Sequence, residues 1–354
     1  MKITYKQLVS AVEQKIVTTT QAEQLWAFWQ AQNKNLPTFK LTHVLYYLGG
    51  MIAIGAMSLF MNLGWERLGG IGLLCICVIY AIIAFSLGEF LLRRYDLVIP
   101  ATVLITLVTV LTPLAVYALE QVIGFWDTDY FYQNYYQHNI LCRLIMEIAT
   151  IVVSICLIYR YRFPFLFLPL ASALWCMSLD LTLYLFDLLG YLREGFDYAN
   201  YSTIREYVSL LFGLFITGIA FVIDLKNKTV KDFSFWLYLS GVITFWGALS
   251  SMYSDSELAK FCYCCINLLM ILIGATIARK VFVVFGALGI TGYLAHLAYD
   301  VFEDSLLFPL VLTLIGLFII FIGIIWQRHE KAINHYLLQF LPQGLKNSIQ
   351  FRKY

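Results

Sequence analysis

Ten apolar stretches, each close to 20 residues long, follow one another along most of the chain. We place them at residues 43–62, 68–88, 97–119, 140–159, 163–186, 206–224, 234–251, 261–278, 281–299 and 305–326. An α-helix needs about 20 apolar residues to cross the hydrocarbon core of a bilayer, and in lipid each backbone polar group must be paired within its own segment. The sequence therefore predicts an all-α, polytopic membrane protein with about ten transmembrane helices.

Composition supports a lipid-facing surface. The chain is 61% hydrophobic and only 13% charged, whereas an ordinary soluble domain is about a quarter charged. Because so few charges cannot cover a water-facing surface, we expect membrane lipids as partners and no nucleic acid. No cofactor is expected either. The cysteines include a cluster at Cys262, Cys264 and Cys265, but it lacks the second ligand pair typical of a zinc site, so no metal is predicted.

The two ends of the chain are more polar than the middle. Thr4 with Gln7 and Thr20 with Glu23 have the spacing of capping boxes, which mark helix starts. They predict two short amphipathic helices, a hairpin that could dock a protein partner. The chain then divides into a cytoplasmic helical hairpin, a ten-helix transmembrane domain and a cytoplasmic amphipathic tail, at residues 1–40, 41–326 and 327–354.

The distribution of charge predicts the orientation. With the N-terminus inside, five of the 24 basic residues lie outside, namely Arg67, Arg143, Arg193, Arg205 and Lys260. The remaining 19 lie in the inner segments, and each inner connection holds at least two of them. This alternation is what the positive-inside rule requires, so both termini are predicted to be cytoplasmic.

Small residues within the stretches predict close helix contacts. Ala84 and Gly88 are four residues apart, as are Gly213 and Thr217. Small side chains let transmembrane helices approach each other closely. We interpret both pairs as packing positions.

The first third of the chain resembles a family of predicted bacterial inner-membrane proteins, the domain of unknown function 2157 family. The resemblance rests on the run Ile16-Val17-Thr18-Thr19-Thr20-Gln21-Ala22, on Gly49-Gly50 and Gly55, on Asn62-Leu63-Gly64-Trp65-Glu66 and on Arg93-Arg94. It implies a multi-pass protein of the bacterial plasma membrane and no catalytic residues to carry over.

Ionisable groups inside the stretches are the candidate functional residues, because each costs about 3 kcal/mol at the centre of a spanning helix. Arg143 and Glu147 lie one helical turn apart, and the spacing continues to Thr150 and Ser154 on the same face. Asp180 lies in the next stretch. At 1.5 Å per residue, Glu147 and Asp180 lie about 10 Å below the outer boundary.

Two later stretches add polar groups near the same depth. One contains Asn267, and the other carries Gly289, Tyr293, His296 and Asp300 on one helical face. If these faces meet those of Arg143 and Asp180, they line an outward-facing polar cavity in which Arg143 pairs with Glu147 or Asp180. His296 would be the group that titrates near neutral pH. The alternatives are an isolated ion pair, a packing histidine and an interhelical hydrogen bond.

Three functions are compatible with these features. The first is a small-solute transporter or permease in which Glu147, Asp180 and His296 handle ions or protons. The second is a membrane-embedded enzyme that acts on a lipid-linked substrate at the outer leaflet, where Arg143 would bind phosphate. The third is a scaffold or regulatory protein without a site, whose partner binds the N-terminal hairpin.

Overall fold

The computed structural model describes residues 12, 14, 16–33, 41–125, 140–189, 198–226, 232–252, 254, 256–297 and five single positions between 310 and 321. Within these residues the regular structure is entirely helical, as predicted. The predicted tail at 327–354, Asp300 and most of the tenth stretch lie outside the described residues.

The helices follow the apolar stretches closely. Helix α3 is the longest and contains a break, and α6 and α7 are joined through the short 3-10 helix η2. The elements are α2 (Thr19–Asn33), α3 (Leu41–Tyr95), α4 (Val98–Ile123), α6 (Ile140–Tyr161), η2 (Pro164–Leu166), α7 (Phe167–Leu188), α8 (Tyr198–Lys226), α9 (Phe233–Ser251), α10 (Glu257–Thr276) and α11 (Lys280–His296).

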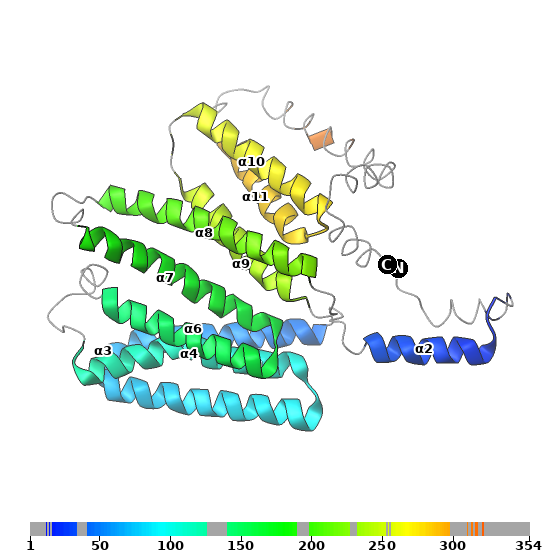
Figure 1. Ribbon diagram of the computed structural model, residues 1–354, viewed down its shortest axis with the longest axis horizontal. Helices are drawn as coiled ribbons and strands as arrows, with labels where there is room; N and C mark the ends of the chain where they lie inside the picture. Colours follow the sequence, from blue (N-terminus) through cyan, green and yellow to red (C-terminus); the bar gives the residue numbers. More distant parts are fainter. Residues whose placement is uncertain are drawn as a thin grey trace.

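The helices pack side by side in nearly the order of the chain (Figure 1). Helix α4 packs on α3 and α6, and α6 packs on α7. Helix α7 then contacts both α8 and α9, and α9 contacts α11, which pairs with α10. One core lies between α3, α4 and α6, around Leu73 and Leu111. A second lies between α8, α9, α10 and α11, around Val242 and Met270.

Helix α3 is a hairpin of two helices that meet at Gly69. There the backbone has φ 61° and ψ 178°, a conformation that essentially only glycine adopts. Gly50 and Gly88, on either side of this break, both face the beginning of α4, whereas Gly70 faces its end near Ala118. The two segments of α3 are therefore antiparallel.

Successive connections alternate between the two ends of the bundle. The C-terminal ends of α3, α6, α8 and α10 lie together at one end (Figure 1). We call this the basic end, because Arg93, Arg160, Lys226 and Arg279 lie there. By the positive-inside rule it is the end predicted to face the cytoplasm.

Seven helical segments of the described chain are long and apolar enough to cross a membrane. They correspond to the second to eighth predicted stretches. Helix α11, the ninth, is apolar but only 17 residues long. The first stretch falls in α3 before Gly69. The chain is thus a multi-pass helical membrane protein, and the count of about ten spans stays a prediction.

Two predicted boundaries were wrong. The capping box at the start of α2 is formed by Thr18 and Gln21, not by Thr20 and Glu23. Gln21 donates its backbone N–H to the Thr18 hydroxyl, and its side chain accepts from the Thr18 N–H. Both pairs have the required spacing, but the helix begins at the first. Helix α8 also starts at Tyr198, eight residues before the predicted stretch, because its first turns are polar yet still helical. The other half of the predicted hairpin, around residues 4–16, lies almost entirely outside the described residues.

Helices α8 and α9 approach each other very closely. A β-carbon added at Gly213 would lie 2.4 Å from the backbone nitrogen of Phe245, and one added at Gly241 would lie 2.5 Å from the Thr217 hydroxyl. This confirms Gly213 and Thr217 as packing positions. Gly88, predicted with Ala84, likewise faces Ile105 of α4 at close range.

Candidate functional site

Helix α6 buries a polar face, and this face organises the candidate site. Its buried residues include Arg143, Glu147, Thr150 and Ser154, the four that the sequence places one turn apart. The hydroxyls of Thr150 and Ser154 donate to carbonyls one turn earlier in the helix, which satisfies them within lipid. The two ionisable groups at the other end of the face must find partners on neighbouring helices.

Arg143 finds its partner on α7. Its Nε lies 2.7 Å from Oδ2 of Asp180, and its Nη2 lies 3.0 Å from Oδ1. Both residues are less than 9% exposed. This two-pronged geometry is the strongest form of an arginine–carboxylate contact. Of the two partners predicted for Arg143, Glu147 and Asp180, it is Asp180 that accepts these hydrogen bonds. The pair joins α6 to α7 across 37 residues of sequence.

Glu147 completes a cluster of three ionisable groups. Its side chain is buried, and its carboxyl group lies within interaction range of that of Asp180. Oε2 of Glu147 is also buried, and no hydrogen-bond donor among the described residues reaches it. The cluster therefore holds two buried carboxyl groups and one guanidinium, and Asp180 accepts two hydrogen bonds from that guanidinium.

Two further groups lie within electrostatic reach of this cluster. Cys176, one turn before Asp180 on α7, lies near both carboxyl groups and near Arg205 of α8. Arg205 was predicted to lie in an outer loop, but it belongs to the first turns of α8. The extension of α8 therefore places a second arginine within electrostatic reach of Cys176.

Asn267 is held at a different helix contact. It is fully buried on α10, where its amide oxygen accepts from Trp246 Nε1 at 3.1 Å and its amide nitrogen donates to the Tyr263 carbonyl. A β-carbon at Gly289 would overlap the Asn267 side chain. Asn267 thus acts as an interhelical hydrogen-bonding residue among α9, α10 and α11, one of the roles expected for it.

His296 is the last residue of α11, at the end away from Arg279. Its Nε2 is 3.5 Å from Oε1 of Glu257, which also accepts from Lys260 at 2.8 Å. The structure therefore divides the predicted site residues between two places. Arg143, Glu147 and Asp180 lie together between α6 and α7. Asn267 and His296 have partners on α9 and α10.

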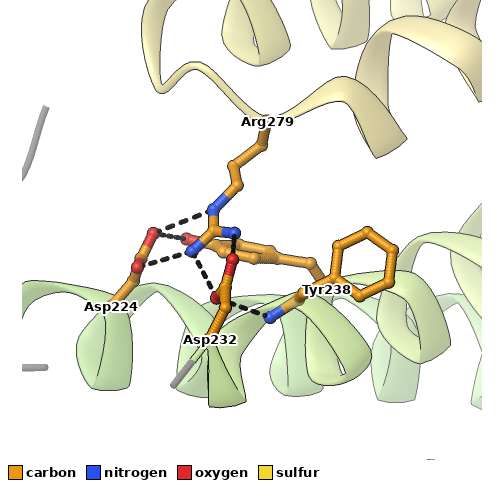
Figure 2. Close-up of polar contacts among 5 residues, drawn as sticks. Asp224, Asp232, Tyr238 and Arg279 are labelled. Carbon is orange, nitrogen blue, oxygen red and sulfur yellow. Dashed lines mark hydrogen bonds and ion pairs between the residues drawn. The ribbon is translucent and has the colours of Figure 1, made fainter. Parts of the chain in front are cut away.

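A third buried cluster was not predicted. Arg279 lies between α10 and α11, yet it is only 5% exposed. It donates to both oxygens of Asp224 at 2.7 and 3.2 Å, and to both oxygens of Asp232 at 2.5 and 3.0 Å. Figure 2 shows its guanidinium lying between the two carboxylates and over the ring of Tyr238, whose centroid is 5.1 Å away.

Local backbone motifs position the Arg279 and Asp232 side chains. Ala278 adopts a left-handed conformation, with φ 56°, and the Arg279 N–H donates to the Gly274 carbonyl. This is the bond that closes a Schellman motif at a helix end. Asp232 is the N-cap of α9 and accepts from the Phe235 N–H. Burial acts to lower the pKa of Arg279, but the hydrogen bonds and charges of Asp232 and Asp224 outweigh it and raise that pKa. The guanidinium therefore stays charged.

The described residues contain no group of three or more metal-binding side chains close enough to hold an ion. Their eight cysteines are all free thiols.

Comparison with known proteins gives no match. No protein-family profile matches the chain, and no curated protein or solved structure is significantly similar to it. The chemistry of the buried clusters therefore carries the functional argument.

Proposed function

We propose that this integral membrane protein is a small-solute transporter coupled to protons, with Glu147 as the proton-carrying group. The observation that carries the proposal is a buried cluster in which Glu147 lies beside an Arg143–Asp180 ion pair and one of its carboxyl oxygens has no hydrogen-bond partner among the described residues. Ionisable residues inside spanning helices are costly and usually mark ion or proton pathways.

The charges of the cluster explain why a proton belongs there. Arg143 and Asp180 neutralise each other, so an ionised Glu147 would leave one negative charge in a nearly dry site. Such a charge is expensive unless it is paired. The inexpensive state therefore has one proton between Glu147 and Asp180. Loss of that proton makes the two carboxylates compete for Arg143, which favours rearrangement of α6 against α7.

Further polar groups continue from the cluster towards the basic end. Thr150 and Ser154 extend the buried face of α6, and α4, which packs on α6, buries Thr106 and Thr109. The Thr109 hydroxyl oxygen is buried and has no hydrogen-bond partner among the described residues. An unsatisfied buried hydroxyl is a site where water or a solute gains a hydrogen bond. We assign the transport path to this α4–α6–α7 contact.

The location of the protein follows the same line of reasoning. We propose the bacterial plasma membrane, with the basic end in the cytoplasm, as the resemblance and the positive-inside rule both imply. In that orientation the cluster lies nearer the outer leaflet.

The alternative of an enzyme acting on a lipid-linked substrate receives less support. It requires Arg143 to bind phosphate, but Nε and Nη2 of Arg143 already donate to Asp180. The scaffold alternative depends on the N-terminal hairpin, of which only α2 is described.

The test is proton movement in proteoliposomes that contain a trapped pH dye. Amino acids, sugars and organic acids are added outside one class at a time, and uptake of the same compounds is followed by mass spectrometry. We expect a class that wild type accumulates with acidification of the interior. Glu147→Gln should abolish the acidification and the accumulation, because an amide cannot release the proton.

Glu206→Gln is the matched control, since it removes a carboxylate of α8 outside the cluster. It should behave as wild type. Dicyclohexylcarbodiimide, which modifies protonated carboxyl groups in apolar surroundings, gives a readout that needs no substrate and should label Glu147. Solute flux that is unchanged in both Glu147→Gln and Asp180→Asn would refute the proposal.

A further inference from the structure

An open groove of about 750 Å³ lies between the ends of α3 and α6 at the basic end of the bundle. Three arginines line it, namely Arg93, Arg94 and Arg160, against the single carboxylate of Glu89. The groove is therefore electropositive. It is separate from the Arg143 cluster, which lies towards the opposite end of α6.

Glu89 is occupied by protein groups, so it does not cancel all three arginines. It accepts hydrogen bonds from Arg93 Nε and from the Tyr161 hydroxyl. Arg160 lies over the Tyr161 ring, 5.3 Å from its centroid. Arg94 makes no hydrogen bond or ion pair with another described residue and is exposed. Arg94 and Arg160 thus keep guanidinium donors for a ligand.

Much of the remaining lining is apolar and lies farther from the basic end. Phe85, Phe90 and Leu157 precede the arginines by one to two helical turns on α3 and α6. Phe85 and Phe90 are exposed on the outside of the bundle, where lipid lies. The groove thus has a basic rim at the level of the headgroups and an apolar wall at the level of the acyl chains.

We propose that this groove binds one anionic phospholipid, such as phosphatidylglycerol, from the leaflet at the basic end. Arg94 and Arg160 bind its phosphodiester, and Phe85, Phe90 and Leu157 contact an acyl chain. Arginine donors match phosphate oxygens well, and basic pockets between spanning helices suit anionic headgroups. A free anion would use the rim and gain nothing from the apolar wall.

The experiment measures lipid retention by native mass spectrometry on the full chain in detergent. The protein is incubated with equimolar phosphatidylglycerol and phosphatidylcholine. We expect wild type to retain one phosphatidylglycerol selectively. Each arginine near a lipid surface contributes about fivefold to the binding of anionic lipid, so Arg94→Gln with Arg160→Gln should reduce this retention about 25-fold.

The matched control is Lys226→Gln with Lys280→Gln, which removes two exposed charges from the same end but outside the groove. It should retain phosphatidylglycerol like wild type. An equal loss in both double variants would show a general surface-charge effect and overturn the proposal. Displacement of the lipid by inorganic phosphate at similar concentration would also overturn it, because the site would then bind free anions.

A second measurement does not depend on the variants folding. Phosphatidylglycerol with a photoreactive acyl chain is cross-linked to wild type in vesicles of the same two lipids. The proposal predicts adducts on peptides that contain Phe85, Phe90 or Leu157. Adducts spread evenly over the lipid-facing helices would contradict it.

Discussion

Arg279 is the side chain whose environment departs most from what its position in the chain suggests. A basic residue between two spanning helices normally faces water, but Arg279 is buried against Asp224, Asp232 and Tyr238. Removing a guanidinium from water costs several kcal/mol, which only full hydrogen bonding offsets. Its contacts connect the α8–α9 pair to the α10–α11 pair, so we expect Arg279 to be important for stability.

We predict that Arg279→Gln lowers the free energy of unfolding by about 3 kcal/mol, since it leaves the buried Asp224 carboxylate without its cation. Unfolding by sodium dodecyl sulfate in mixed micelles measures the change. Arg279→Lys should be intermediate, because an ammonium cannot bind both carboxylates in the same forked way. Lys280→Gln is the control, since the neighbouring lysine is exposed. Equal stability of Arg279→Gln and Lys280→Gln would contradict the assigned role.

The contrast between Arg143 and Arg279 shows what the sequence allows at this scale. Arg143 lies inside an apolar stretch, where its cost is evident, and its spacing from Glu147 defines a helix face. Arg279 lies at a boundary, where basic residues are counted as solvated. Two acidic residues could have identified it, because Asp224 and Asp232 lie at the same end of the bundle, against the overall charge bias. Which carboxylate meets which arginine depends on helix neighbours, and periodicity does not report these.

At the scale of the helix pair, glycines without side chains let α8 and α9 pack closely against each other. Gly213 and Gly241 bring the two backbones into direct contact, which strengthens the van der Waals attraction between the helices. In lipid, where no hydrophobic effect drives helices together, this closeness is a main source of pairing. The spacing of Gly213 and Thr217 predicted a packing face on α8, and α9 is its partner.

We predict that Gly213→Ala destabilises the protein by about 2 kcal/mol. The added methyl group would lie 2.4 Å from a backbone atom of α9, so the helices must separate, and overpacking of this kind costs 1–3 kcal/mol. Gly218→Ala on the same helix is the matched control, because a β-carbon there meets nothing within 4 Å. Thermal unfolding in detergent compares the two variants. If Gly218→Ala is equally destabilised, the loss at Gly213 does not come from its contact with α9, and the prediction is wrong.

Helix boundaries were predictable only where hydropathy changes at the residue at which the helix begins or ends. Polar residues such as Ser202 and Arg205 at the start of α8 ended the predicted stretch, although they are compatible with a helix that continues beyond the hydrocarbon. Within α3 the turn is made by Gly69 alone, with helix on either side. A single glycine conformation of this kind is set by tertiary packing, so sequence patterns predicted two stretches there but not the way in which they join.

At the scale of the whole molecule, alternation of charge and alternation of helix direction agree. The C-terminal ends of α3, α6, α8 and α10 lie together, and basic residues lie in or just after the last turn of each. Hydropathy and loop charge were sufficient for this level of the fold. They did not show that the polar groups divide into clusters on either side of α9, because depth in the membrane does not specify which helices are neighbours.

We predict that cysteines introduced at the two ends of the bundle react from opposite sides of the membrane. A membrane-impermeant maleimide should label Ser256→Cys in intact cells, and should label Asp96→Cys and Lys226→Cys only after the membrane is opened. The wild-type cysteines, which lie in the spanning helices, provide the background. Labelling of Lys226→Cys in intact cells would reverse the orientation assigned to the basic end.

The contact between Asp224 and Arg279 also constrains the order of biosynthesis. The two residues are 55 positions apart, so α8 and α9 are both synthesised before the arginine. Until then Asp224 lacks the guanidinium that it binds in the folded protein, and its carboxylate must be solvated by water or carry a proton. The α8–α9 pair therefore gains this counter-ion only after α10 has been synthesised. Formation of the Asp224–Arg279 ion pair is thus a late step in the assembly of this half of the protein.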